Sequence, residues 1–161
     1  MRTTESVRTI RRYTQHIDAP PERVLPLLCP VREAEWLDGW GDICEILHSE
    51  SGLVEEGCVF RTTGADGVET IWMTTRLDPA EGIVEFVRVT PGLVATHLRL
   101  RVEPAADASS LVHVTYTHTP LGAKGSEFVA VNHSEEEFVR GMLWWEKSMN
   151  HWLRTGETLR H

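Results

Sequence analysis

The side chains best able to do chemistry in this sequence are Arg88, Tyr116 and His118, each within a run of alternating apolar residues. Such alternation is typical of a β-strand, in which every second side chain points to the same face. A histidine has a pKa near neutrality without tuning, so it can exchange protons with a bound molecule. An unpaired buried arginine is costly, so Arg88 has to meet a carboxylate, water or an anionic ligand. The three residues therefore suit either a small-molecule site or ordinary core and ion-pair roles.

Two tryptophans four residues apart, Trp36 and Trp40, are a second unusual feature of the sequence. They flank Leu-Asp-Gly in the segment CPVREAEWLDGW at 29–40. Tryptophan is large, and its indole N–H needs a hydrogen-bond partner when it is buried. The pair either plugs one end of the core or lines the wall of a pocket, and we favour the wall.

The eight histidines and three cysteines form no metal-binding pattern. The sequence contains no H-E-x-x-H motif and no C-x-x-C spacing. It also lacks the G-x-S-x-G turn of serine hydrolases and the glycine-rich signatures of nucleotide-binding loops. We therefore expect neither a metal nor a cofactor.

Length, composition and charge restrict the class of protein further. A chain of 161 residues without a linker or repeat suits one domain, 1–161. A net charge of −8 without a basic cluster argues against nucleic-acid and membrane partners. No apolar run is long enough to span a membrane. Three cysteines without a signal peptide predict reduced thiols in the cytoplasm.

The elements that position these residues follow from periodicity and turn signals. Residues 7–17 alternate as a strand, and the proline-rich segment after it predicts short helices at about 21–28 and 31–36. Turns rich in glycine, aspartate and proline separate six further strand-like runs, at 42–48, 57–63, 68–77, 83–89, 94–103 and 111–118. The short connections predict an antiparallel meander.

The C-terminal segment has the features of one long helix. Ser134 and Glu137 form a capping box, and Gly156 is a suitable stop. The residues Phe138, Met142, Trp145, Met149 and Trp152 follow the spacing of one apolar helix face. An antiparallel sheet must bury its apolar face, and this helix is the only large element available to cover it.

This order of elements resembles the helix-grip fold of the START-like, or SRPBCC, superfamily, which includes birch-pollen-allergen-like carriers and polyketide cyclases. Ile17-Asp-Ala-Pro-Pro-Glu-Arg-Val, the segment 29–40 and the closing helix carry the resemblance, which covers nearly the whole chain. It implies an α+β fold, with a seven-stranded curved antiparallel sheet wrapped around one long C-terminal helix and two short helices after the first strand. In this superfamily the space between sheet and helix commonly binds apolar or amphipathic molecules, and some members catalyse reactions there.

Counting outward from each turn predicts which residues face that space. Turns centred on Asp66, Ala80, Pro91 and Asp107 give the pairs Phe60–Trp72, Trp72–Arg88, Thr74–Phe86, Phe86–Thr96, Val84–Leu98, Leu98–Tyr116 and Thr96–His118. Paired residues point the same way, so all of these should face inward. Thr74, Thr96 and His118 then share one row across the sheet, with Arg88 one row away. The inner face should be apolar at one end and polar at the other.

The leading hypothesis is that the cavity binds a small apolar or amphipathic molecule, which is aromatic, polyketide-like or lipid-like. The expected ligand-binding residues are Trp36, Trp40, Phe60, Trp72, Thr74, Phe86, Arg88, Thr96, Leu98, Tyr116, His118, Met142, Trp145 and Met149. One alternative is an enzyme of the polyketide cyclase or dehydratase type, with His118 as the proton shuttle. A second is a START-like protein-interaction module, which would need an exposed apolar patch. The sequence leaves a homodimer open.

Overall fold

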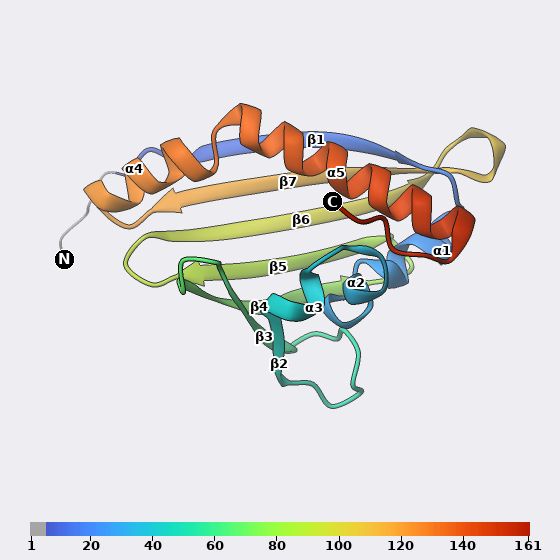
Figure 1. Cartoon of the computed structure of the whole chain (residues 1–161), viewed down its shortest axis with the longest axis horizontal. Coiled ribbons are helices and arrows are strands. Elements are labelled where there is room, and N and C mark those ends of the chain that lie inside the picture. Colours follow the sequence, from blue (N-terminus) through green and yellow to red (C-terminus); the bar gives the residue numbers. More distant parts are fainter. Residues whose placement is uncertain (1–5) are drawn as a thin grey trace.

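The computed structural model describes residues 6–161, in which one seven-stranded sheet carries a long helix on one face (Figure 1). All neighbouring strands are antiparallel, and their order is β1-β7-β6-β5-β4-β3-β2. The strands are β1 (Thr9–Ile17), β2 (Cys44–His48), β3 (Val59–Thr63), β4 (Glu69–Asp78), β5 (Ile83–Thr90), β6 (Val94–Pro104) and β7 (Ser110–Pro120). The predicted α+β meander is confirmed, and β1 closes it by pairing with β7.

The α-helices lie before β2 and after β7, and one short 3₁₀ helix lies between β6 and β7. Figure 1 shows α5 running along β1 and β7, while α2 and α3 lie towards the other strands. Their bounds are α1 (Pro21–Val24), η1 (Leu25–Leu27), α2 (Pro30–Trp36), α3 (Trp40–Ile43), η2 (Ala106–Ala108), α4 (Ala123–Asn132) and α5 (Glu135–Thr155). None of the helices between residues 6 and 161 has both the length and the apolar character needed to cross a membrane.

The long helix α5 begins and ends at the predicted residues. The Ser134 side chain accepts a hydrogen bond from the backbone N–H of Glu137, and Gly156 ends the helix with a φ of 74°. The Glu137 carboxylate pairs with Arg140 and makes no hydrogen bond back to Ser134, so only half of the predicted capping box forms. Gln15 of β1 donates to the Met142 carbonyl oxygen at 3.0 Å, which fixes the helix against the first strand.

Two helices were not predicted. The segment expected to be strand from residue 42 begins as α3, because Gly39 adopts a φ of 77° and turns the chain into one further helical turn. No element was predicted for the α4 segment, which has little apolar periodicity and contains Gly125. It is held by tertiary contact, since a Cβ at Gly125 would lie 2.0 Å from the Leu93 carbonyl oxygen.

Replacing Gly125 with alanine should therefore destabilise the protein, even though alanine is the better helix former. The Leu93 carbonyl group is backbone and cannot move aside, so we expect a loss of about 1–3 kcal/mol in the free energy of unfolding. Urea unfolding followed by circular dichroism would measure it. Ser126→Ala, at the exposed neighbouring residue, is the control and should cost much less. Equal stability of both variants would show that α4 packs loosely.

The inner face of the sheet, defined as the face toward α5, carries the predicted residues. The predicted register between β5 and β6 was wrong, however, so two residue pairs differ. Phe86 pairs with Leu98 and Val84 with Leu100, so the β5–β6 turn is centred on Gly92 and not on Pro91. The shift is two residues, and an even shift keeps every side chain on its predicted face. The remaining predicted strand pairs agree with the observed register.

The same shift changes which polar residues lie in one row. Arg88 lies opposite Thr96, which lies opposite His118, so these three form a single row across β5, β6 and β7. Thr74 lies one row away, opposite Phe86. The polar side chains of the inner face are thus gathered more closely than predicted, with Arg88 in the same row as Thr96 and His118.

The residues after α5 return to the loop between α2 and α3. Leu159 forms a β-bridge with Leu37, and the Thr158 hydroxyl donates to the Glu35 carbonyl oxygen at 2.8 Å. The ring of His161 stacks on Trp144 of α5 at 3.9 Å between centroids. We call residues 156–161 the C-terminal tail; it joins the end of α5 to the α2–α3 segment.

Candidate functional site

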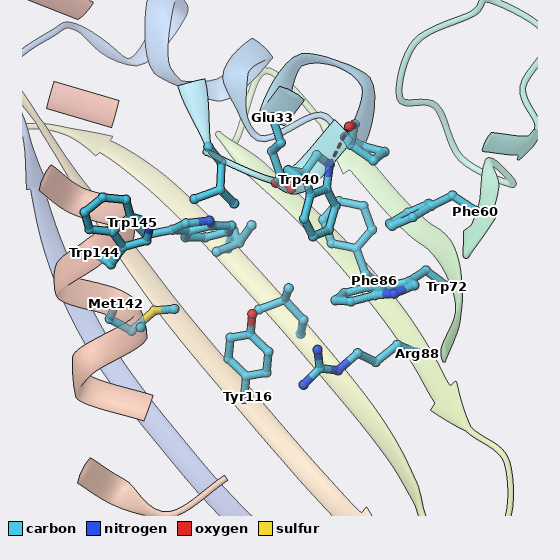
Figure 2. Close-up of a pocket in the computed structure, with 15 residues that line it drawn as sticks. Glu33, Trp40, Phe60, Trp72, Phe86, Arg88, Tyr116, Met142, Trp144 and Trp145 are labelled. Atoms are coloured by element: carbon cyan, nitrogen blue, oxygen red, sulfur yellow. Dashed lines mark hydrogen bonds between the residues drawn. The ribbon is translucent and has the colours of Figure 1, made fainter. Parts of the chain in front are cut away.

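A cavity of about 270 Å³ lies between the sheet, α5 and the α2–α3 segment. Figure 2 shows aromatic side chains around most of its wall, with Arg88 and Glu33 on different sides. The predicted site residues that line it are Trp40, Phe60, Trp72, Phe86, Arg88, Leu98, Tyr116, Met142 and Trp145. Lining residues absent from the predicted set are Pro30, Glu33, Leu37, Leu100, Gly141 and Trp144.

Four aromatic rings pack together to form one side of this cavity. Phe60 stacks on Trp72 with 5.3 Å between centroids, and Trp40 meets Trp72 edge to face at 6.4 Å. Phe86 meets both Phe60 and Trp72 edge to face. The Trp72 indole N–H donates to the Thr62 hydroxyl at 2.9 Å, so the polar atom of this ring has its hydrogen-bond partner. This side is a rigid apolar surface suited to a flat ring system.

The two tryptophans of the segment 29–40 have different roles. Trp40 lines the cavity, and its indole N–H donates to the Pro30 carbonyl oxygen at 2.7 Å. Trp36 is fully buried behind the wall, donates to the Leu27 carbonyl oxygen and packs edge to face on Trp145. The prediction of a wall position therefore fits Trp40, whereas Trp36 has the core position that was the alternative. The i, i+4 spacing could not separate the two positions.

Arg88 lies between two aromatic rings on the cavity floor. Its guanidinium carbon is 4.8 Å from the Trp72 ring centroid and 5.3 Å from that of Tyr116. No carboxylate of residues 6–161 forms an ion pair with it, and burial lowers its pKa. The aromatic faces compensate the charge only in part. A half-buried cation that lines a cavity in this way is suited to receive an anionic group from a ligand.

Glu33, which was not among the predicted site residues, is a buried carboxyl group in the cavity wall. Its side chain makes no hydrogen bond or ion pair to any residue that the structure describes, and desolvation raises its pKa to about 8. The group is therefore mainly protonated at neutral pH. No signal in the sequence marked this position, because α2 ends at Trp36 and Trp40 lies on the separate helix α3, so spacing alone could not bring Glu33 and Trp40 to one cavity.

His118 lies in an adjoining chamber of about 160 Å³, and not in the main cavity. Arg88, Tyr116, Gly141 and Met142 line both spaces and separate them. The ring of His118 stacks on that of His133 with 4.2 Å between centroids.

The predicted proton-shuttle role of His118 is not supported by this environment. Its Nδ1 atom is 2.9 Å from the Thr96 hydroxyl, and its side chain is almost fully buried. Desolvation, followed by the neighbouring His133 and Arg88, lowers its pKa to about 3. A neutral imidazole with so low a pKa is a poor base near neutrality. The sequence could not reveal this, because the pKa depends on packing with α4 and α5.

The depressed histidine pKa values predict acid sensitivity. Burial also lowers the pKa of His133 to about 4, whereas both rings have ordinary values near 6.5 in the unfolded chain. Below about pH 6.5 the unfolded chain binds protons that the native protein excludes. The free energy of unfolding therefore decreases as the pH falls from 6.5 towards 4. Each histidine contributes up to roughly 1.4 kcal/mol per pH unit to this decrease.

Glu33 acts in the opposite direction, because its raised pKa of about 8 stabilises the fold as the pH falls below 8. Comparing the unaltered protein with His118→Asn separates the contribution of the histidine, because Glu33 is present in both. The free energy of unfolding in urea at pH 7, 6 and 5 should fall less steeply in the variant. Equal slopes for the two proteins would contradict the assignment. His151→Asn, on α5 and outside both cavities, is a control that should keep the original slope.

The other predicted site residues lie outside both spaces. Thr74 and Thr96 are buried on the strands of the sheet, and Met149 of α5 is a buried core residue. The three cysteines are free thiols, and burial raises the pKa of Cys44 to about 12. A thiol with so high a pKa is a poor nucleophile.

A seven-stranded antiparallel sheet holding a long C-terminal helix over a largely apolar cavity is the helix-grip fold that the sequence resemblance predicted. Truncated norcoclaurine synthase from Thalictrum flavum has this fold, at 12% identity and a TM-score of 0.71 over 96% of this chain and 99% of that chain. Ara h 8.0201 has it at 16% identity and a TM-score of 0.65, over 92% and 99% of the two chains.

A further structure is that of norcoclaurine synthase in complex with dopamine and hydroxybenzaldehyde. It matches at 14% identity and a TM-score of 0.68, over 96% of this chain and 91% of that chain. The TM-scores establish the shared fold, and at identities this low they establish the fold alone. No family model and no curated protein matches the sequence.

Proposed function

We propose that this protein binds a small aromatic molecule with an anionic group in the cavity between the sheet and α5. The observation that carries the proposal is Arg88, a half-buried guanidinium in an aromatic cavity without a carboxylate partner among residues 6–161. A protein that used this space only as core would gain stability from an apolar residue there. A ligand anion would complete the missing ion pair.

The shape and size of the cavity support a ring system as the ligand. An apolar cavity of about 150 Å³ is enough for benzene, and this one measures about 270 Å³. Two fused rings can therefore lie against the Trp40 and Trp72 side with the anion on Arg88. The norcoclaurine synthase complex supports the location, because that protein of the same fold was solved with two small aromatic molecules.

Titration with 6-ethyl-2-naphthoate tests the proposal. Trp40, Trp72, Trp144 and Trp145 line the cavity, so binding should quench tryptophan fluorescence in a saturable manner. Native mass spectrometry should show one ligand per chain. The uncharged 2-ethylnaphthalene is the matched control, and we expect it to bind more weakly because it cannot pair with Arg88. Absence of saturable binding by both compounds would overturn the proposal.

A further inference from the structure

The cavity holds two ionisable groups of opposite type that do not meet. Arg88 lies between Trp72 and Tyr116 on the sheet, whereas Glu33 projects from α2 on a different side of the same space (Figure 2). No ion pair joins them, although both line the cavity. Glu33 is therefore a buried group, and Arg88 a half-buried one, without a counter-charge among residues 6–161.

The surroundings of Glu33 offer it no other charged partner. Arg32, its neighbour on α2, pairs instead with Glu35 at 2.9 Å. The charge of Glu33 acts on two nearby titratable groups, Cys44 of β2 and Tyr116 of β7, and burial raises the pKa of both so that they are neutral at physiological pH. The only cationic group in the cavity wall is Arg88, which does not reach it. Within residues 6–161, the carboxyl group of Glu33 thus has space in front of it and no protein cation to fill that space.

We propose that Glu33 is a cation subsite, so that the cavity selects an aromatic molecule with an ammonium group at one end and an anionic group at the other. The inference rests on the proposed function, because it assigns the second end of the same ligand. The anion pairs with Arg88, the rings lie against the aromatic side, and the ammonium pairs with Glu33.

Binding of such a molecule must release a proton. At pH 7 the empty site holds Glu33 mainly as the neutral acid, since its pKa is about 8. The ammonium group arrives with its charge and pairs with a carboxylate, so the carboxyl proton passes to the solvent. Proton release should be close to one per ligand at pH 7 and should disappear above about pH 9, where Glu33 is already ionised.

The test compares 6-(aminomethyl)-2-naphthoate with 6-ethyl-2-naphthoate, which has the same shape but no ammonium group. Isothermal titration calorimetry in phosphate and in Tris, buffers of different ionisation enthalpy, gives the affinity and the number of protons released. We expect the aminomethyl compound to bind about tenfold more tightly, as a charge-assisted hydrogen bond allows. Only this compound should release a proton.

Glu33→Gln should remove both the preference and the proton release. Glu35→Gln is the matched control, because Glu35 lies on the same helix but is exposed and faces Arg32. It should keep both properties. If Glu33→Gln fails to fold, the two-buffer measurement on the unaltered protein decides the matter alone.

The outcomes separate this inference from the proposed function. Binding of the ethyl compound without any gain from the ammonium group, or a gain without proton release, overturns the Glu33 subsite and leaves the aromatic-anion site intact. Failure of both naphthoates to bind overturns the proposed function and the subsite together.

Discussion

Arg88→Met should make the protein more stable and at the same time remove its affinity for aromatic anions. The guanidinium group loses solvation on burial and recovers only about 0.5–2 kcal/mol from Trp72 and Tyr116. Methionine fills similar space without that cost. We expect a gain of about 1 kcal/mol and a rise of roughly 2–4 °C in the melting temperature. The affinity for 6-ethyl-2-naphthoate should fall at least about 30-fold, as for loss of one partner of a buried charge pair.

Arg99→Met is the control for this variant. Arg99 is exposed on the outer face of β6 and pairs with Glu85 at 2.9 Å. Its replacement should leave the naphthoate affinity unchanged and should not stabilise the fold. An Arg88→Met protein that is destabilised yet binds the naphthoate normally would show that Arg88 is a structural residue. Stability and affinity that change in opposite directions are typical of groups retained for binding.

Gly141→Leu should have the second large effect, by filling the cavity from the helix side. Gly141 lies in α5 and lines both spaces, and a Cβ built there meets no atom within 4 Å. Leucine improves the helix by about 1 kcal/mol over glycine and buries its side chain against the aromatic wall. We expect a higher melting temperature and loss of saturable naphthoate binding.

Gly141→Ala separates the two contributions to that result. Alanine supplies the gain in helix stability but leaves most of the cavity open. It should therefore raise the melting temperature while retaining the binding of 6-ethyl-2-naphthoate. If Gly141→Leu binds the naphthoate with unchanged affinity, the ligand site lies elsewhere.

The strands and the inner face could be predicted because alternation and turn residues are local signals. The error at the Pro91 turn arose because the three-residue loop spans residues 91–93 and is centred on Gly92, which adopts a φ of 72°. That error shifted the pairing by two residues, so Arg88 and His118 remained on the correct face. Packing of α5 against the sheet then decided which inner residues line a cavity and which are core, and no local pattern contains that information.

The acid–base properties of the site could not be predicted from residue type. Histidine has the ordinary pKa closest to neutrality, yet His118 is held neutral by burial beside His133. Glutamate is ordinarily ionised, yet Glu33 has its pKa raised to about 8 because nothing charged accompanies it into the interior. Desolvation depends on the whole fold, and here it reverses the expected order of the two groups.

The C-terminal tail has a practical consequence for every binding measurement described above. His161 stacks on Trp144, a residue of the cavity wall, and Leu159 is bridged to Leu37, another lining residue. An affinity tag fused after His161 would therefore start beside Trp144 of the cavity wall. A polyhistidine sequence there would add imidazoles next to a reporter tryptophan, so titrations should use protein from which any such fusion has been cleaved.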